Sequence, residues 1–402
     1  MAVPHSDDFE TCDILIVGAG LAGLCAAIGF AKAGFDVVSC GATDRLGHGR
    51  TVALLGSSVD FLQELEIWRD IEPIGAPLRS LRIIDDTGAL FPPRPVAFHA
   101  DEIDLDAFGW NVENARLADR LADAAGGCGN LRRVESPIVS FDFAGSRAQL
   151  RLADGRGFAP RLVVGADGRN SPARRAAGIE TRPHVYPQKA LTVLLAHTRS
   201  HDDFSTEFHT RQGPFTLVPL PPAPQARFRS SLVWAMSEAE AERRAALDDS
   251  ALSGEIEAQA RSMLGLMRIL GERGVFPMSR QIVTRLWAAR LALVGDAAHG
   301  LPPIGAQGLN LGLRDVKALI TATRQAAAEG ADIGGGATLA AYARARRPDI
   351  AMRALVVDGL NRSLLAHFAP LDVARGAGLA ALGAIGPLRR MLMREGVAPR
   401  LG

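Results

Sequence analysis

The chain has 402 residues, of which 48% are hydrophobic and 22% are charged, and its formal net charge at pH 7 is +1. This length exceeds one ordinary hydrophobic core, so two closely packed domains are expected. The composition is that of a globular protein. Basic and acidic residues are interspersed, which argues against a nucleic-acid-binding surface.

The cysteines fit no zinc-binding or thioredoxin-like spacing; they are Cys12, Cys25, Cys40 and Cys128. We therefore expect buried, reduced thiols and a cytoplasmic protein. The first 12 residues are polar and acidic, which argues against a signal peptide. The chain has no run of about 18 uninterrupted apolar residues, so no transmembrane helix is predicted.

The chain begins with a pattern typical of dinucleotide-binding proteins. An apolar run at 13–17 ends in GAGLAG, residues 18–23; an alanine-rich helix follows, and 35–39 is predicted to be a second strand. In the GxGxxG fingerprint, the first glycine allows a tight turn, the second lets a pyrophosphate approach the backbone, and the third packs helix against strand. The helix N-terminus favours the anion. An accidental glycine-rich turn is the alternative, but the strand–turn–helix context favours dinucleotide contacts from Gly18, Gly20, Leu21, Ala22 and Gly23.

One expected feature of this fingerprint is missing. An acidic residue normally follows the second strand and binds the ribose hydroxyls, but here the sequence is SCGA, residues 39–42. The nearest carboxylate is Asp44. Either the ribose is held in another way, or Asp44 reaches back to it. A solvated loop residue is an equally good interpretation of Asp44.

Strands alternate with helices at both ends of the chain, around a strand-rich insertion. Helices are predicted at 57–68, 114–125 and 238–270, and strands within 77–98, 131–143, 147–152, 161–166, 183–235 and 291–294. This order predicts an α/β protein with discontinuous domains. The nucleotide-binding domain would comprise 10–76, 100–180 and 281–350, the substrate domain 77–99 and 181–280, and a C-terminal helical segment 351–402.

Three of these strands end in glycine or a carboxylate, and ligands of α/β sheets bind at such carboxyl ends. The motifs are GAGLAG, ADGRNS (166–171) and GDAAHGLPPIGAQGLN (295–310). In this order they resemble the FAD-dependent aromatic hydroxylases, monooxygenases of the p-hydroxybenzoate hydroxylase-like fold. The stretches RTVALLGSSVDFLQEL (50–65) and IGAQGLNLGLRDVKAL (304–319) are similar to the ubiquinone-biosynthesis branch. The resemblance covers nearly the whole chain, although GAQG at 305–308 departs from the commoner AGQG.

The resemblance implies a Rossmann-like FAD-binding domain with an inserted, sheet-rich substrate domain. Asp296 would hold the ribityl or ribose part of FAD, and the loop 303–310 would lie along the isoalloxazine ring. The helix beginning near Leu309 would stabilise negative charge on the reduced ring. Arg50 would reach the diphosphate. Beyond the glycine motif, the implied FAD contacts are Arg50, Asp167, Gly295, Asp296, Pro303, Gly305, Ala306, Gln307, Gly308, Leu309 and Asn310.

Several of these residues have a simpler interpretation. Arg50 fits a surface ion pair, Gln307 and Asn310 fit helix caps, and His299 fits a packed residue at a strand end better than a catalytic one. The insertion also holds potential metal ligands, namely His197, His201, His209 and Glu207. Their spacing fits no metal-binding pattern, so no metal site is predicted.

The implied reaction is hydroxylation of a polyprenylated phenol in ubiquinone biosynthesis by a flavin C4a-hydroperoxide, with O2 and either NAD(P)H or a redox protein as electron donor. The chemistry belongs to the cofactor, so no obligatory catalytic side chain is expected. Substrate contacts are assigned to Tyr186, Leu217 and Pro303. A plausible apolar wall, for which plain core is the alternative, consists of Leu191, Val193, Leu195, Phe215, Leu217, Val218 and Trp234.

The C-terminal segment combines an apolar stretch, 379–385, with three arginines within 387–394. This pattern suits peripheral contact with the inner face of the cytoplasmic membrane, but a helix packed on the domain or a homo-oligomer contact fits equally well. Other quinone-biosynthesis enzymes are candidate partners. Rival functions are hydroxylation of a small soluble aromatic, a flavin-bearing structural role in a quinone-synthesis complex, and reduction of isoprenoid double bonds without oxygen consumption.

Overall fold

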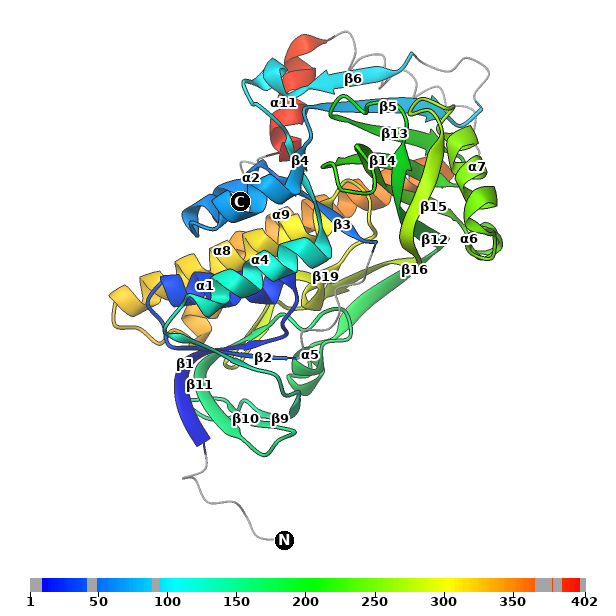
Figure 1. Ribbon diagram of the computed structural model, residues 1–402. Helices are drawn as coiled ribbons and strands as arrows, with labels where there is room; N and C mark the ends of the chain where they lie inside the picture. Colours follow the sequence, from blue (N-terminus) through cyan, green and yellow to red (C-terminus); the bar gives the residue numbers. More distant parts are fainter. Residues whose placement is uncertain (1–8, 42–48, 89–93, 366–377, 379–384, 398–402) are drawn as a thin grey trace.

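The computed structural model describes residues 9–41, 49–88, 94–365, 378 and 385–397. It contains two large sheets, one at each end of the molecule, with helices between and around them (Figure 1). This arrangement confirms the predicted α/β class. None of the helices in the described part of the chain is long and apolar enough to cross a membrane.

The first sheet forms the predicted dinucleotide-binding unit. Its order is β17 (Trp287–Ala288), β18 (Leu291–Leu293), β11 (Gly157–Gly165), β1 (Phe9–Val17), β2 (Val37–Cys40) and β8 (Leu131–Val134). In addition, β10 (Gln149–Leu152) pairs with β11, and β9 (Ile138–Asp142) pairs with β10. The strands from β18 to β8 are parallel. Strands of parallel sheets are buried on both faces, which explains the continuous apolar runs in β1 and β18.

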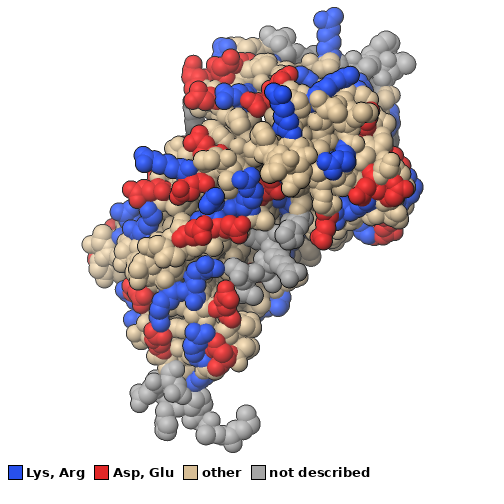
Figure 2. All heavy atoms as spheres, in the orientation of Figure 1, with Lys and Arg blue, Asp and Glu red and all other residues tan. Residues whose placement is uncertain are grey.

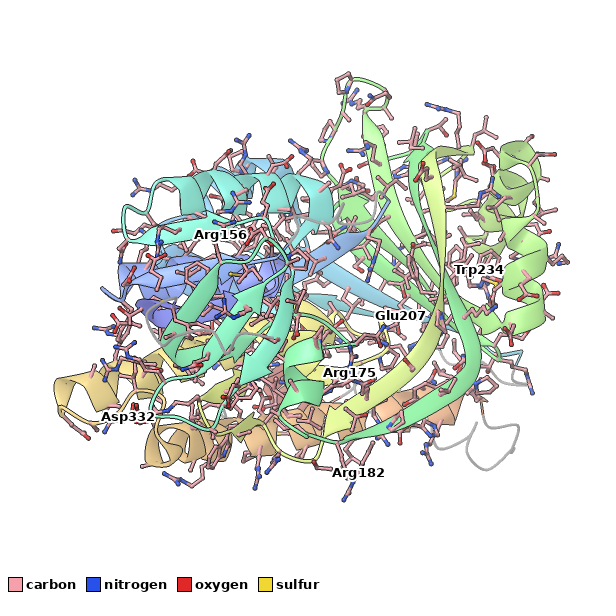
Figure 3. All side chains as sticks on the ribbon, turned by 90° about the horizontal axis from the view of Figure 1, so that it is seen from below. Arg156, Arg175, Arg182, Glu207, Trp234 and Asp332 are labelled. Atoms are coloured by element: carbon pink, nitrogen blue, oxygen red, sulfur yellow. The ribbon has the colours of Figure 1, made fainter. Side chains whose placement is uncertain are left out.

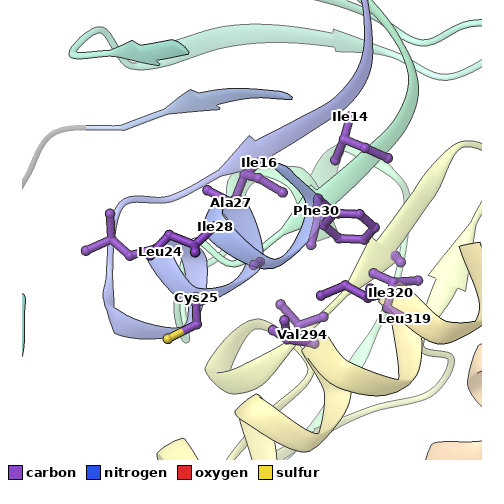
Figure 4. Packing of buried hydrophobic residues seen from close by; sticks show 14 of the residues in the cluster. Ile14, Ile16, Leu24, Cys25, Ala27, Ile28, Phe30, Val294, Leu319 and Ile320 are labelled. Carbon is purple, nitrogen blue, oxygen red and sulfur yellow. The ribbon is translucent and has the colours of Figure 1, made fainter. Parts of the chain in front are cut away.

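Helices α1 (Leu21–Lys32), α4 (Asn114–Gly126) and α8 (Gln307–Ala328) lie side by side over this sheet (Figure 1). Figure 4 shows their core, in which Phe30 of α1 lies toward Leu319 and Ile320 of α8. A Cβ at Gly29 would lie 2.5 Å from Cδ1 of Ile320, so the glycine lets these two helices approach without turning the Ile320 side chain aside.

The second sheet contains the strand-rich insertion. Its order is β19 (His299–Gly300), β16 (Met267–Val283), β12 (Thr181–His197), β15 (Phe228–Ser237), β14 (Gly213–Leu220), β13 (Phe204–Thr210), β5 (Ser80–Asp86) and β6 (Val96–His99). Helices α6 (Glu238–Ala245) and α7 (Asp249–Gln259) cover one face. Most of the predicted apolar wall packs there as core, including Leu191, Val193, Leu195, Phe215, Leu217 and Trp234. Figure 3 shows Trp234 beside these helices.

One secondary-structure prediction was wrong. Residues 260–270 were expected to continue a charged helix, but α7 ends at Gln259 and the strand β16 begins at Met267. β16 pairs with β12 from Thr181↔Val283 to His197↔Met267. This long-range pairing overrides the local helical preference, because strand formation depends strongly on neighbouring strands.

The remaining elements connect the two sheets. A small third sheet contains β3 (Thr51–Leu55), β7 (Gly109–Glu113) and β4 (Gly75–Pro77). Helix α9 (Gly336–Leu365) runs from the first sheet to the second and continues through the domain boundary predicted at residue 350. The other helices are α2 (Gly56–Glu64), α3 (Trp68–Ile71), α5 (Pro172–Ala176) and α11 (Gly386–Val397), with 3-10 turns at Glu72–Ile74, Ala100–Ile103 and Gly295–Ala297.

Candidate cofactor-binding site

The three glycine-containing motifs meet at one edge of the first sheet. β1 pairs with β11 as far as Val17↔Gly165, and β11 pairs with β18 as far as Gly165↔Leu293. The connecting turns are equally close, since a Cβ at Gly18 would lie 2.4 Å from the carbonyl oxygen of Ala166. Gly18 has φ +111°, a conformation that favours glycine.

The N-terminus of α1 has the form of an anion site. Gly20 precedes the helix, no side chain caps it, and a Cβ there would meet nothing within 4 Å. A Cβ at Gly23 would instead lie 2.0 Å from the carbonyl oxygen of Gly18. Gly23 therefore packs the helix against the turn, whereas Gly20 leaves open space in front of the free N–H groups, as a bound diphosphate requires.

Asp167 has an unused oxygen at this edge. Its Oδ2 accepts a hydrogen bond from the N–H of Ala173 at 3.0 Å, whereas its Oδ1 is buried without a partner in the described structure. Burial raises the pKa of this carboxyl. Because buried polar atoms nearly always have partners, the free oxygen fits a hydroxyl donor of a bound cofactor.

The turn that carries Asp296 is tied to the second motif by two arginines that sequence reasoning did not single out. The Nε atom of Arg169 lies 3.5 Å from Oδ2 of Asp296, and the Arg169 guanidinium donates a hydrogen bond to the carbonyl of Leu301 at 2.6 Å. The buried Arg174 donates to the carbonyl of Ala297 at 2.9 Å. The Asp296 side chain itself is 46% exposed. ADGRNS contains Arg169, but its partners are more than 100 residues away and cannot be read from the motif.

A buried ionic group, formed by Asp315, His299 and Arg346, holds the same turn in place. Asp315 Oδ2 accepts the N–H of Gly295 at 3.1 Å and also bonds the Nε2 of His299, while Asp315 Oδ1 accepts from Arg346 at 2.8 Å. Burial opposes ionisation of Asp315, but His299 and Arg346 outweigh it and lower the pKa of the carboxyl. His299 is completely buried in this group, as the simpler interpretation expects.

The loop before α8 packs on the second sheet through Ile304 and leaves the N-terminus of α8 without a capping side chain. Gly305 and Ala306 have positive φ angles of 64° and 54°, and Ala306 precedes α8 without a capping side chain. A Cβ at Gly308 would meet nothing within 4 Å. Among the described residues, the Gln307 side chain bonds the carbonyl of Gly305 alone, at 2.7 Å. The free N–H groups of α8 therefore suit negative charge on a bound flavin.

Asn310 is occupied by the protein itself. Its Oδ1 accepts hydrogen bonds from Leu55 N–H at 2.9 Å and from the Ser58 hydroxyl at 2.6 Å. Its Nδ2 donates to the carbonyls of Ala53 at 2.7 Å and Ala306 at 2.6 Å. Asn310 thus joins α8 to β3 and α2 and fixes the direction in which the helix N-terminus points.

The remaining predicted site residues are spread more widely. The exposed Arg50 guanidinium lies 4.8 Å from the centre of the Phe276 ring. Tyr186 donates to Asp358 Oδ1 at 2.7 Å and packs in one cluster with Ile304 of the flavin loop. Burial and this bond raise the pKa of Tyr186 to about 12. Pro303 is exposed, and Leu217 lies on the other face of the second sheet, beneath α6 and α7.

At the adenosine end, Cys40 ends β2 and is buried, which raises the pKa of its thiol to about 12. The thiol is therefore uncharged at neutral pH. Asp44 lies outside the described residues. No group of three or more His, Cys, Asp or Glu side chains within the described ranges is arranged to hold a metal ion. His197 instead bonds Ser230 Oγ at 3.0 Å and His209 bonds Glu207 at 2.8 Å.

The fold and the sequence relatives define an FAD-dependent monooxygenase with a p-hydroxybenzoate hydroxylase-like architecture. The family model described as FAD binding domain matches residues 11–356, and the chain belongs to this family. The resemblance to FAD-dependent aromatic hydroxylases, the fold class and FAD as cofactor are thereby confirmed.

The chain is similar over most of its length to two hydroxylases. It is 33% identical over 395 residues to ubiquinone hydroxylase UbiL of Rhodospirillum rubrum, covering 96% of this chain and 89% of the relative. It is 29% identical over 394 residues to 3-demethoxyubiquinol 3-hydroxylase of Escherichia coli, covering 96% and 98%.

Solved structures share the fold at lower identity. PqsL of Pseudomonas aeruginosa, a probable FAD-dependent monooxygenase, superposes with a TM-score of 0.76 at 23% identity and covers 92% of this chain and 100% of its own. The p-nitrophenol 4-monooxygenase PnpA of Pseudomonas putida gives a TM-score of 0.79 at 18% identity, covering 98% and 100%.

Proposed function

We propose that this enzyme hydroxylates the aromatic ring of a polyprenylated phenol in ubiquinone biosynthesis. The observation that carries the proposal is the similarity to a named ubiquinone hydroxylase over 96% of the chain, which includes all three motifs. O2 supplies the oxygen atom, and NAD(P)H or a redox protein supplies the electrons. Bound FAD would activate oxygen for transfer to an electron-rich ring.

The protein's own contribution is binding, orientation and exclusion of water. The α1 N-terminus and Asp167 suit the diphosphate and ribityl parts of FAD, and the α8 N-terminus suits the electron-rich side of the ring. Asn310 holds α8 in place through four hydrogen bonds. Ile304 brings the flavin loop against buried apolar residues of the second sheet, and such a dry site strengthens every electrostatic interaction within it.

We further propose that the enzyme lies peripherally on a membrane, where a prenylated substrate resides. On α9, Met352, Leu355 and Val356 are 50%, 67% and 53% exposed and share one side of the helix at spacings of three and four residues. On α11, Met391 and Leu392 are 58% and 46% exposed. The two helices are linked, because Arg353 donates to the carbonyl of Glu395 at 2.7 Å.

The arginines of the C-terminal segment offer less free positive charge for membrane contact than the sequence suggests. Arg389 is bound to Glu102 and Arg394 pairs with Asp104 at 3.3 Å, so α11 is packed on the domain. Most of the apolar stretch 379–385 lies outside the described residues. Figure 2 shows mixed charges over the visible face rather than one basic area. These exposed apolar residues of α9 therefore carry the membrane proposal. Vesicle co-sedimentation of Leu355→Ser/Val356→Ser tests it, with exposed Ala337→Ser, at the opposite end of α9, as the control.

The catalytic proposal is tested with purified, FAD-loaded enzyme, a prenylated phenol, NADPH and isotopically heavy O2. We expect substrate-stimulated NADPH oxidation and a product that carries one heavy oxygen atom. If the phenol is inert but a small soluble aromatic is hydroxylated, the substrate assignment is wrong. If FAD binds tightly and neither class stimulates donor oxidation, a structural role in a quinone-synthesis complex is favoured. A deletion strain should accumulate a prenylphenol that lacks oxygen atoms.

Association with other quinone-biosynthesis enzymes, and with further copies of this chain, is also part of the proposal. Size-exclusion chromatography of the holoenzyme with light scattering gives its oligomeric state, and the same run with candidate enzymes tests the complex. A monomer that co-elutes with none of them would contradict both associations.

A further inference from the structure

The second sheet has two faces of different chemistry. Along β12, Leu191 and Val193 belong to the core beneath α6 and α7, whereas Ala190 belongs to the cluster that contains Ile304 of the flavin loop. Successive side chains of a strand point to opposite faces. Thr192 therefore shares the face of Ala190, which meets Ile304 of the flavin loop, and lies on the face opposite to Leu191, Val193 and Trp234.

Thr192 occupies the centre of this inner face. It pairs with Val233 of β15 on one side and with Gly274 of β16 on the other. Three neighbouring positions, each two residues along its strand and on the same face, contact different parts of the cofactor domain. Ser231 accepts a hydrogen bond from Thr51 at 2.9 Å, Phe276 lies under the Arg50 guanidinium at 4.8 Å, and Ala190 clusters with Ile304.

The hydroxyl of Thr192 has no partner at this central position. The side chain is only 8% exposed, and its Oγ1 is buried without a hydrogen bond to any described residue. Gly274 opposite has no side chain, and the ring of Phe276 covers the space beside it, since a Cβ there would lie 2.4 Å from this ring and 2.9 Å from the Thr192 oxygen. The Phe276 ring must therefore turn aside for a ligand to reach this hydroxyl. The neighbouring Ser231 hydroxyl, in contrast, is held by Thr51 and by Asn111 at 3.2 Å. A buried hydroxyl normally has a partner, so the missing one points to a ligand.

We propose that Thr192 binds the oxygen of the phenolic ring of the substrate and so selects which ring carbon faces the flavin. The proposal rests on the proposed function and deepens it. A threonine hydroxyl accepts a hydrogen bond from a phenol and donates one to a phenolate, so it serves either protonation state. The surrounding Ala190, Val233 and Ile304 are apolar, so this hydroxyl distinguishes the oxygen-bearing edge of the ring from its other edges.

The test compares 2-geranylphenol with geranylbenzene, which lacks the ring oxygen, on the FAD-loaded enzyme. Binding is followed through the flavin absorbance. Thr192→Val removes the hydroxyl at nearly constant volume, and Thr192→Ser retains it. We expect Thr192→Val to bind the phenol roughly 3- to 10-fold more weakly, the range that one hydrogen bond supplies, and Thr192→Ser to bind it within about twofold of wild type. Geranylbenzene should bind wild type and Thr192→Val alike.

The matched control is Thr323→Val, which removes a buried hydroxyl that donates to Leu319 within α8. It should leave the phenol affinity unchanged. If Thr192→Val weakens both ligands equally, the threonine is only a packing residue and the inference is overturned. Unchanged phenol binding in Thr192→Val also overturns the inference. In either case the proposed function stands as long as the wild-type enzyme binds the phenol. If wild type binds no phenol, the proposed function fails and the assignment of Thr192 fails with it.

Discussion

Replacement of Asn310 by alanine should loosen the flavin-facing helix and destabilise the whole protein. The side chain is 1% exposed and makes four hydrogen bonds, to Leu55, Ser58, Ala53 and Ala306. Each such bond contributes about 1 kcal/mol net, and each buried group left unpaired costs more than that. We therefore expect a loss of about 3 to 5 kcal/mol, a large part of the total stability of a typical domain.

The assay is urea unfolding of the FAD-free protein, followed by titration with FAD. Gln307→Ala is the control, because this neighbouring side chain makes a single bond, to the carbonyl of Gly305 at 2.7 Å. We expect Gln307→Ala to lose less than about 1 kcal/mol. Asn310→Ala should also bind FAD more weakly, since the α8 N-terminus is no longer held against β3. A destabilisation by Asn310→Ala no larger than that of Gln307→Ala would refute the reasoning.

Three further predictions concern the same site. Gly20→Ala should leave the FAD-free protein as stable as wild type but weaken FAD binding. Gly23→Ala, whose Cβ would lie 2.0 Å from the carbonyl oxygen of Gly18, should also lower the stability of the FAD-free protein. Thermal melts and FAD titration distinguish the two variants, and equal melting temperatures would contradict the prediction. Asp167→Asn should keep or raise the stability of the FAD-free protein at pH 7, because burial raises the pKa of Asp167 and disfavours its ionised form. The same substitution should weaken FAD binding, and an undiminished FAD affinity would exclude a role of Asp167 in cofactor binding. The pKa of Asp315 is lowered in the folded protein, so ionised Asp315 stabilises the fold above the unfolded pKa of about 3.9, and this stabilisation is lost as the pH falls through the folded pKa. The free energy of unfolding in urea, measured from about pH 5 downward, should therefore depend less steeply on pH in Asp315→Asn than in wild type. An unchanged slope would count against an ionised Asp315.

The motifs and their order could be read from the sequence, because each reports a local requirement. Gly18 and Gly23 are needed where backbone meets backbone, and the apolar run before them marks a strand buried on both faces. These short-range features predicted the first sheet and its carboxyl edge as the cofactor site. The same local reasoning failed for residues 260–270, where charge indicated a helix but the chain turns after α7 and then pairs with β12 from Met267 onward.

Which side chains reach the site was decided only by the tertiary structure. Arg169, Arg174 and Asp315 contact the GD turn from distant positions in the chain, and no local spacing records those contacts. The alternation in β12 is visible in the sequence, but it does not say which face looks toward the flavin loop. That depends on where α6, α7 and α9 pack, and it separates Leu217, in the core, from Thr192, at the centre of the inner face. Periodicity determines that a strand has two faces, whereas long-range packing determines what each face meets.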